Sequence, residues 1–368
     1  MMELLAGILF SVILQDFLLY IGLIFNFKNH NPSDIDIEYP QISIFVPARN
    51  EAEYLPFCLE SLSHIDYPSD KIEFIIGNDD SNDATEEIIN NWTSRAQNRK
   101  LLNISPQISM RMNGKANALS QMIAVAKGDY FLFTDADCSV PHRWALEMAG
   151  SAIHSNSDLV TGITKVLPKN WFASMQGLDW WLTLGMVKIG SDLGYSITSM
   201  GNNMLISRKA YEAIGGFEGL PLSVTEDFEI AKAVNNKKLK AIHQISRDNL
   251  IETHAQLNFH NLLVQRKRWL KGAMGLPFLW KFMLGLQVIY FPAIIIFMCF
   301  NPGLGLALWI AKILTQALFI KDFARPTGTI ILPFYLITFE LYYLFVSWST
   351  LVYYFWPVNI KWKGRHYA

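Results

Sequence analysis

Four long stretches of the chain are almost unbroken runs of apolar residues, at 4–25, 282–300, 303–320 and 330–356. About 20 apolar residues are enough to cross the hydrocarbon core of a bilayer as a helix. The turn sequence at 301–303 separates the second run from the third. Residues 28–280 are mostly polar and hold nearly all of the charge. The pattern therefore predicts a polar domain held between membrane segments.

The first apolar run has two interpretations, a retained anchor or a cleaved signal peptide. No basic residue precedes the run, and no small-residue cleavage site follows it. We therefore favour the anchor. The predicted domains are an anchor at 1–27, a polar domain with interfacial helices at 28–280, membrane segments at 281–356 and a basic tail at 357–368.

Basic residues beside the apolar runs predict orientation, because Lys and Arg concentrate in cytoplasmic loops. Basic residues follow the first run, precede the second, follow the third and close the chain. All four groups favour the cytoplasm, so we expect a multi-pass protein of the cytoplasmic membrane whose polar domain faces the cytoplasm. A single crossing by 330–356 would place the tail outside, so either this run is a re-entrant or interfacial hairpin, which we favour, or the tail departs from the rule. Glu340 would then face water, whereas a carboxylate inside the membrane would be a functional candidate.

Composition excludes several classes of protein. Hydrophobic residues make up 51% of the chain, charged residues 17%, and the net charge is −1. These values exclude a disordered chain and a nucleic-acid binder that relies on bulk positive charge. The three cysteines fit neither a disulfide framework nor a four-ligand zinc site. Nothing in the sequence indicates an obligate protein partner.

Within the polar domain, short apolar runs alternate with helix-like segments. Strands are predicted at 42–47, 74–77 and 129–134, with helices at 52–63 and 85–92. This alternation predicts an α/β fold with a parallel sheet wound by helices. Polar clusters follow each strand, at 48–51, 79–83 and 135–137. Because ligands bind at the carboxyl ends of such strands, we expect these clusters to form one site.

Each cluster has a chemical and a structural interpretation. Asp135 and Asp137 have the spacing to bind one Mg²⁺ or Mn²⁺, which also takes ligands from phosphates and water, or they are turn residues. Asp79 either accepts hydrogen bonds from a ribose or base, or caps a helix. Lys115, after Gly114, either approaches a phosphate or is solvated.

Two further clusters follow the sheet. Glu226 and Asp227 precede a helix-like segment, 228–234, where carboxylates also stabilise a helix for purely structural reasons. Gln265, Arg268 and Trp269 share one helix face. Beside the second apolar run, that face has the alternative interpretation of a basic membrane flank with an interfacial tryptophan.

Taken in order, these motifs resemble those of the membrane-bound family-2 glycosyltransferases with a GT-A fold, most closely the ceramide-glucosyltransferase-like branch. The matching features are the P-A-R-N-E sequence at 47–51, Asp79, the G-K pair at 114–115, the D-A-D sequence at 135–137, the E-D pair at 226–227, Q-x-x-R-W at 265–269 and the tail at 362–367. Asn78 departs from the pattern, because many relatives carry the first Asp of an Asp-Asp pair there.

The resemblance implies an inverting enzyme that moves a sugar from a nucleotide sugar, UDP-linked in our expectation, to a lipid hydroxyl. Asp227 would be the general base, with Glu226 beside it. Asp135 and Asp137 would hold Mg²⁺ or Mn²⁺. The nucleotide sugar would be bound by Pro47, Arg49, Glu51, Asp79, Lys115, Asp135, Gln265, Arg268 and Trp269.

The resemblance also implies that residues 201–204 and 215–217 shape the acceptor cleft. The aromatic stretch 171–182 lies either at the headgroup level, open to a lipid, or in a core-facing helix. Two alternative functions stay open. One is a processive polysaccharide synthase, for which four apolar runs are few to build a channel. The other is an inactive membrane scaffold or transporter with a glycosyltransferase-like domain.

Overall fold

The computed structural model describes residues 1–32, 38–106, 112–357, 360–362 and 365–367, the last two ranges as backbone only. The chain divides into two compact units. A helical unit contains Met1–Phe27, Val166–Ile189 and Ala255–Ile360, and an α/β unit contains Lys28–Lys165, Gly190–His254 and Lys361–Ala368. Residues 166–189 and 255–280, which the sequence assigns to the polar domain, therefore group with the apolar helices.

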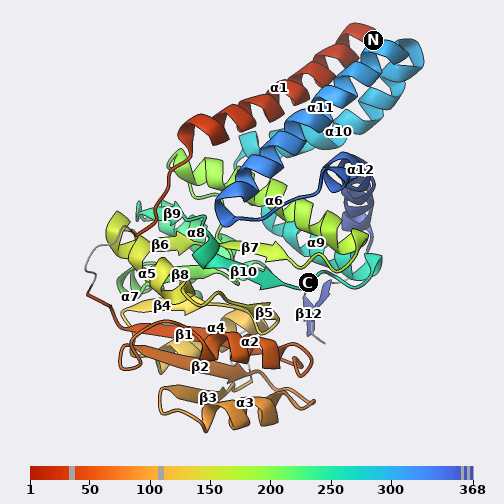
Figure 1. Cartoon of the computed structure of the whole chain (residues 1–368). Coiled ribbons are helices and arrows are strands. Elements are labelled where there is room, and N and C mark those ends of the chain that lie inside the picture. The colour runs from red at the N-terminus through yellow and green to blue at the C-terminus, as the bar shows by residue number, and fades with distance from the viewer. Residues whose placement is uncertain (33–37, 107–111, 358–359, 363–364, 368) are drawn as a thin grey trace. The chain divides into compact units, whose positions relative to one another are not determined.

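The α/β unit is built on a seven-stranded sheet with the order β3-β2-β1-β4-β8-β6-β9 (Figure 1). Its strands are β3 (Arg99–Asn103), β2 (Ile72–Asn78), β1 (Ile42–Ala48), β4 (Tyr130–Phe133), β8 (Met204–Ser207), β6 (Leu159–Thr161) and β9 (Ala241–His243). Strands β3, β2, β1 and β4 are parallel, as predicted. Strand β8 runs antiparallel to both β4 and β6. The predicted α/β fold is therefore confirmed, and the antiparallel strand β8 is an addition that the pattern of alternating strands and helices did not predict.

Helices cover both faces of this sheet. The core on one face includes Ile44 of β1 with residues of α2 (Leu55–Ser63), α3 (Thr85–Thr93) and α5 (Trp144–Ser155). The core on the other includes Phe45 with residues of α4 (Gly114–Ala124), α7 (Arg208–Ala213) and α8 (Glu226–Asn236). Successive side chains of a strand point to opposite faces, and both faces here are buried. This explains why the central strands are continuous apolar runs.

Besides the seven-stranded sheet, the α/β unit contains only short strands and turns among the residues that the structure describes. A second sheet has the order β5-β10-β7 and contains β5 (Cys138–Ser139), β10 (Leu250–Thr253) and β7 (Ile163–Val166). Two 3₁₀ turns occupy Phe217–Gly219 and Arg247–Asn249. In the tail, β11 (Ile360–Trp362) pairs with β12 (Arg365–Tyr367). The side chains of the predicted tail motif at 362–367 lie outside the described part of the chain.

The order of the parallel strands creates a switch point. From β1 the chain adds β2 and then β3 on one side, and it returns to place β4 on the other side of β1. Beyond the carboxyl ends of β1 and β4 the connections diverge, and such a crevice is where α/β sheets bind ligands. The polar clusters that the sequence places after β1, β2 and β4 therefore share one edge of the sheet.

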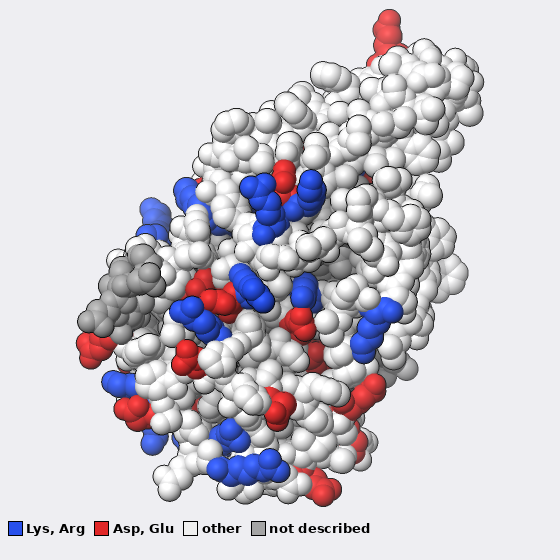
Figure 2. All heavy atoms as spheres, in the orientation of Figure 1, with Lys and Arg blue, Asp and Glu red and all other residues white. Residues whose placement is uncertain are grey.

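The helical unit consists of α1 (Met2–Asn26), α6 (Trp171–Asp192), α9 (Phe259–Ala273), α10 (Phe278–Phe300), α11 (Pro302–Ala324), the 3₁₀ turn Arg325–Thr327 and α12 (Pro333–Phe355). Among the described residues, four helices are long and apolar enough to cross a membrane: Met2–Asn26, Phe278–Phe300, Pro302–Thr327 and Pro333–Phe355. Figure 2 shows that the visible surface along the middle of α1 and α11 carries almost no charged side chains, which appear instead toward the ends of these helices. That composition is typical of helices in contact with lipid.

The prediction of a hairpin at 330–356 is wrong. The chain forms one helix from Pro333 to Phe355, without a break. A hairpin needs a turn, but the prolines of this segment, Pro333 and Pro357, lie at the start of the helix and beyond its end. The prediction that Glu340 faces water is also wrong, since this side chain is 0% exposed.

Glu340 instead forms a buried ion pair. Its carboxylate oxygens lie 3.0 and 3.2 Å from Nζ of Lys312 on α11, and both side chains are fully buried. Asp16 of α1 contributes a second carboxylate, with Oδ2 3.9 Å from the same ammonium. A buried charge is costly unless it is paired. The three helices are therefore held in register by a polar contact that only matching positions on α1, α11 and α12 can make.

We expect Lys312→Met to destabilise the protein by about 3–5 kcal/mol, because it leaves the buried carboxylates of Glu340 and Asp16 without their cation. The double variant Lys312→Met/Glu340→Leu, which removes both charges of the closer pair, should be more stable than Lys312→Met. The apparent melting temperature of the purified protein in detergent is the measurement. A double variant that melts below Lys312→Met would contradict this role of the pair.

Candidate active site

The ends of β1 and β2 are joined by Arg49. Its Nη1 donates a hydrogen bond to the backbone oxygen of Asp79 at 2.5 Å and to Oδ2 of Asp80 at 3.3 Å. The backbone N–H of Asp79 in turn donates to the oxygen of Ala48 at 2.9 Å. Asn50 and Asp80 both have a positive φ, which marks the tight turns that bring the two strand ends together. Arg49 therefore shapes the loop that presents Asp79.

Asp79 is not the residue that caps the helix after β2. The N-cap of α3 is Ala84, and Asp83 just before it accepts hydrogen bonds from the N–H groups of Thr85 and Ala52 at 3.0 and 3.1 Å. Asp79 itself is buried, with 7% of its surface exposed. The structural alternative that the sequence allowed for Asp79 is therefore wrong.

Pro47 and Glu51 lie at the carboxyl end of β1 and just after it. Pro47 lies within β1, where it is paired with Gly77 of β2. Glu51 is buried, and its backbone N–H donates to Oγ1 of Thr85 at 2.8 Å while its carbonyl accepts from the N–H groups that begin α2. The P-A-R-N-E sequence thus fixes the backbone between β1 and α2.

Lys115 lies at the centre of the acidic residues. Its Nζ is 2.6 Å from Oδ1 of Asp135 and 3.3 Å from Oε1 of Glu226, and its side chain is 12% exposed. It also donates to the backbone oxygen of Gly201 at 3.5 Å. Burial alone would lower the pKa of this ammonium, but the charges of Asp135, Glu226 and Asp227 raise it above its usual range. Lys115 is therefore a permanent cation and not a solvated lysine.

Asn113 positions Lys115, and sequence analysis missed it. Its side-chain oxygen caps α4 by accepting from the N–H of Ala116 at 2.8 Å. Its amide nitrogen donates to the backbone oxygen of Ser223 at 2.6 Å and to Oε2 of Glu226 at 3.4 Å. One side chain thus connects the start of α4 to the start of α8. An asparagine just before Gly114 is a common N-cap signal that could have revealed it.

Asp227 lies in the first turn of α8, not before the helix as predicted. Its carboxylate accepts hydrogen bonds from the N–H groups of Gly201 at 2.9 Å and Phe228 at 2.8 Å. Burial is the main cause that raises its pKa to about 6, with the charge of Glu226 acting in the same direction. Lys115 and the two N–H groups oppose the shift. A carboxylate with this pKa is ionised near neutral pH and is a better proton acceptor than an ordinary aspartate.

Asp135 and Asp137 follow β4 and are partly exposed. Burial, followed by the charge of Asp135, raises the pKa of Asp137 to about 6. Among the described residues no group of three or more His, Cys, Asp and Glu side chains is arranged to hold a metal ion. The donor set nevertheless fits Mg²⁺ or Mn²⁺, which are bound by one or two carboxylates when phosphates and water complete the coordination. Four carboxylates around one lysine also leave an excess of negative charge for a divalent cation.

The remaining predicted residues lie in the helical unit. Gln265, Arg268 and Trp269 are on α9. The Trp269 ring packs on Trp180 of α6, with ring centroids 5.3 Å apart. Trp181 is 4% exposed, so this part of the aromatic stretch is core-facing. The α/β unit, in contrast, contains Pro47, Arg49, Glu51, Asp79, Lys115, Asp135, Asp137, Glu226 and Asp227.

Asp179 and Arg266 form an ion pair that sequence analysis also missed. The pair joins α6 to α9, and both side chains are nearly buried. The guanidinium carbon of Arg266 also lies 4.6 Å from the Trp269 ring centroid. The signal in the sequence was a single carboxylate, Asp179, directly before two tryptophans. This contact fixes the helix that carries the Q-x-x-R-W sequence.

A mixed sheet with acidic residues at its switch point is typical of a Rossmann-like α/β domain that binds a ligand there. The chain belongs to glycosyl transferase family 21, whose family model matches residues 4–368. The resemblance stated from the sequence motifs is thus confirmed.

Curated relatives match part of the chain. The probable glycosyltransferase YdaM of Bacillus subtilis is 27% identical over 218 residues, which cover 54% of this chain and 47% of that protein. The beta-monoglucosyldiacylglycerol synthase of Synechocystis is 25% identical over 239 residues, which cover 64% of this chain and 48% of that protein. The chain thus spans about half the length of the curated relatives it matches.

Among solved structures, the chain is similar to the mannosyltransferase PcManGT from Pyrobaculum calidifontis, in complex with GDP-Man and Mn²⁺. The TM-score is 0.61 at 18% identity, and the match covers 97% of this chain and 99% of that one. At this identity the similarity shows the fold, which is the GT-A fold predicted from the sequence, combined with long apolar helices.

Proposed function

We propose that the protein transfers a sugar from a nucleotide sugar to the hydroxyl group of a membrane lipid, with inversion at the anomeric carbon. The main structural support for this reaction is the arrangement of Asp135, Glu226 and Asp227 around the Lys115 ammonium at the switch point of the sheet. Membership of glycosyl transferase family 21 supports the reaction class. Relatives named beta-monoglucosyldiacylglycerol synthase support a lipid acceptor.

The donor would bind along the ends of β1, β2 and β4. Asp79 would contact the uridine, and Arg49 and Glu51 would hold the loop around it. Lys115 would bring positive charge toward the diphosphate, as would Arg268, while Gln265 and Trp269 would contact the sugar or acceptor. Asp135 and Asp137 would hold Mg²⁺ or Mn²⁺, which when bound neutralises the charge of the leaving diphosphate.

Asp227 would be the general base. It takes the proton of the acceptor hydroxyl as the oxygen forms a bond to the anomeric carbon, and the bond from that carbon to the diphosphate oxygen breaks on the opposite side. The N–H groups of Gly201 and Phe228 orient the carboxylate, and the nearby Glu226 helps keep its pKa close to neutral. The products are the glycolipid, with its new bond inverted, and a nucleoside diphosphate.

We also propose that the α/β unit faces the cytoplasm, where nucleotide sugars are available. The basic residues that follow α1, precede α10 and follow α11 support this orientation, because Lys and Arg concentrate in cytoplasmic loops. Accessibility of a cysteine introduced at the exposed Asp70, in sealed membrane vesicles of known orientation, would test it.

The activity can be tested with membranes that contain the protein, incubated with a panel of radiolabelled nucleotide sugars and then extracted for lipids. We expect label from one donor to enter the organic phase as a lipid that carries a single sugar. Membranes with the Asp135→Ala variant serve as the control and should give no labelled lipid. A ladder of sugar oligomers would instead indicate a processive synthase, and a protein that neither binds nor hydrolyses any donor would be an inactive scaffold.

A further inference from the structure

The place of α12 relative to a membrane follows from the helices that it contacts. Helices α1, α10 and α11 pack against one another, and Figure 1 shows α12 outside that bundle, near α6 and α9. More of α12 contacts α9 than contacts α10 or α11. All of these helices belong to the helical unit, so their mutual contacts show on which side of the bundle α12 begins and ends.

Helix α9 lies outside the hydrocarbon core of the membrane. It carries four basic side chains, Arg266, Lys267, Arg268 and Lys271. Charged side chains are costly inside a membrane. Four residues, 274–277, connect α9 to α10, so α9 marks the side on which α10 begins. Asn301 alone connects α10 to α11, and the two helices pack together. The chain therefore returns, and α11 ends on the side of α9.

The start of α12 contacts α6. Nε1 of Trp171, the first residue of α6, donates a hydrogen bond to Oγ1 of Thr338 at 3.4 Å. The centroid of the Trp171 ring also lies 6.3 Å from that of the Tyr342 ring. Helix α6 itself packs on α9 through Trp180 and Trp269. The start of α12 is therefore on the side of α9.

The end of α12 contacts α9 directly. Nζ of Lys267 donates a hydrogen bond to the backbone oxygen of Trp356 at 2.7 Å, and it lies 5.4 Å from the centroid of the Tyr353 ring. Earlier in α12, the Phe345 ring lies 5.2 Å from the Phe259 ring of α9. A helix that crossed the membrane from the side of α9 would end on the opposite side, near the turn between α10 and α11. Both ends of α12 are instead on one side.

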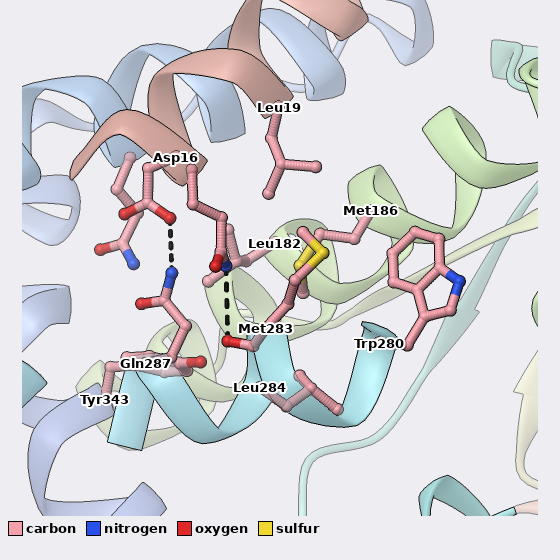
Figure 3. Close-up of a pocket in the computed structure, with 11 residues that line it drawn as sticks. Asp16, Leu19, Leu182, Met186, Trp280, Met283, Leu284, Gln287 and Tyr343 are labelled. Atoms are coloured by element: carbon pink, nitrogen blue, oxygen red, sulfur yellow. Dashed lines mark hydrogen bonds between the residues drawn. The ribbon is translucent and has the colours of Figure 1, made fainter. Parts of the chain in front are cut away.

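Between its ends, α12 reaches part of the way into the bundle. Glu340 pairs with Lys312 of α11, which is nine residues, or about 14 Å of helix, from Lys321. Figure 3 shows Tyr343 beside Gln287 of α10, which is also nine residues, about 14 Å, from the first residue of that helix. The hydrocarbon core is about 30 Å thick. Helix α12 therefore extends no further than about the middle of the membrane.

One face of α12 is apolar and exposed along the whole helix. Its members recur every three or four residues and are each at least 37% exposed: Phe334, Ile337, Leu341, Phe345, Trp348, Val352 and Phe355. This spacing is that of a single helix face. The opposite face is buried against the protein, with Leu336, Phe339 and Val346 among its residues. A helix with these two faces can lie in the plane of a membrane with its apolar face in lipid.

We propose that α12 is an in-plane helix in the leaflet on the side of α9, and that α1, α10 and α11 are the membrane-crossing helices of the described chain. The exposed face of α12 lies against the acyl chains of that leaflet, and its other face packs on α6, α9 and α11. By the orientation proposed above, this leaflet faces the cytoplasm. Lys361 and Arg365, beyond α12, are then on the side where basic residues concentrate.

The depth of α12 can be measured by nitroxide labelling of single cysteines in the full-length protein in phosphatidylcholine vesicles. The exposed Cys299 is replaced by Ser, and the buried Cys58 and Cys138 are retained. Labels at the exposed Ile337, Phe345 and Val352 report depth through their accessibility to oxygen and to a water-soluble nickel complex. We expect the depth at 345 to lie within about 5 Å of the other two. In a crossing helix it would be deeper than both by about 10 Å.

Helix α11 supplies the matched control for the depth measurement. Leu304, Ile310 and Leu318 are exposed and have a similar spacing along a helix that crosses the membrane. Ile310 should be deeper than the other two by about 10 Å. A depth profile of α12 that matches that of α11 would overturn the proposal. All of the labelled positions are exposed, so the melting temperature should stay close to that of the wild type.

The side on which α12 ends can be measured with a membrane-impermeant maleimide in sealed vesicles. Pro357→Cys, just beyond the helix, should react from the same side as Lys321→Cys at the end of α11. Gly303→Cys, in the turn between α10 and α11 where an added Cβ meets no atom within 4 Å, should react from the opposite side. Reaction of Pro357→Cys from the side of Gly303→Cys would overturn the proposal.

Neither measurement depends on sugar transfer or on the orientation of the whole protein. A protein that transfers no sugar but has both ends of α12 on one side would leave this inference standing and reject the proposed function. A crossing α12 in a protein that transfers sugar to a lipid would do the reverse.

Discussion

Replacing Asp227 by Asn should lower kcat by about 100- to 10,000-fold while the donor still binds, because the variant cannot accept the proton of the acceptor hydroxyl. Asparagine retains the size of the side chain and one oxygen, which can accept from one of the two N–H groups, those of Gly201 and Phe228, that bind the two carboxylate oxygens of Asp227. The dissociation constant for the donor, measured by calorimetry, should therefore change little. Normal turnover in the purified variant would contradict the assignment of Asp227 as the base.

Asp70→Asn makes the same chemical change at an exposed position outside the site and should leave turnover unchanged. Loss of stability is not expected to explain the result for Asp227. Its pKa rises on folding from 3.8 to about 6, so the stability that this carboxyl contributes is fully present below pH 3.8 and is lost as the pH rises through about 6. At neutral pH a neutral amide therefore avoids the cost of burying the ionised carboxylate.

The pH dependence of the wild type follows from the same group. The base must be ionised to accept a proton, so kcat/KM should fall about tenfold per pH unit below a pKa of about 6. In Asp227→Asn the residual activity should lack this acid limb. A residual activity that keeps the limb would assign it to another carboxyl, such as Asp137.

Replacing Asp135 by Ala should lower turnover by at least about a thousandfold, because it removes a ligand of the proposed cation and with it several kcal/mol of charge stabilisation. It also removes the 2.6 Å partner of Lys115. Adding a chelator to the wild-type enzyme should have a comparable effect, which Mn²⁺ or Mg²⁺ should reverse.

Added metal should not restore Asp135→Ala at any concentration. Asp135→Asn, which retains the shape of the side chain but not its charge, serves as the matched variant and should show a large loss as well. Full activity of the wild type in excess chelator would contradict a divalent cation in the reaction. Full activity of Asp135→Ala would contradict the assignment of its ligand.

Residues close to a strand end in sequence were the most predictable part of the site. Asp79 and Asp135 follow short apolar runs that the sequence predicts to be buried strands, and the carboxyl ends of parallel strands meet at one edge. The Lys115–Asp135 pair was not predictable by this reasoning. The two residues lie on different elements, and their 2.6 Å contact depends on how α4 packs across the sheet.

For the candidate membrane helices, too, the sequence predicted some features and not others. Their length and apolar character are local properties, so the runs at 4–25, 282–300 and 303–320 predicted α1, α10 and α11 to within a few residues. The hairpin at 330–356 was wrong because it was inferred from the charges at the end of the chain. Whether a helix bends is decided by its own backbone, and this segment contains no internal turn residue.

The sequence by itself determined the class of protein. The spacing of apolar residues and the positions of turn residues depend on a few neighbouring positions, so both can be recognised in the sequence. Tertiary structure alone decided which charges meet. Asp16, Lys312 and Glu340 are charged residues within three apolar runs, and their contact depends on the rotation and depth of three helices. The same holds for Asp179 and Arg266. Electrostatic contacts act over a few ångströms in space, and sequence separation does not limit them.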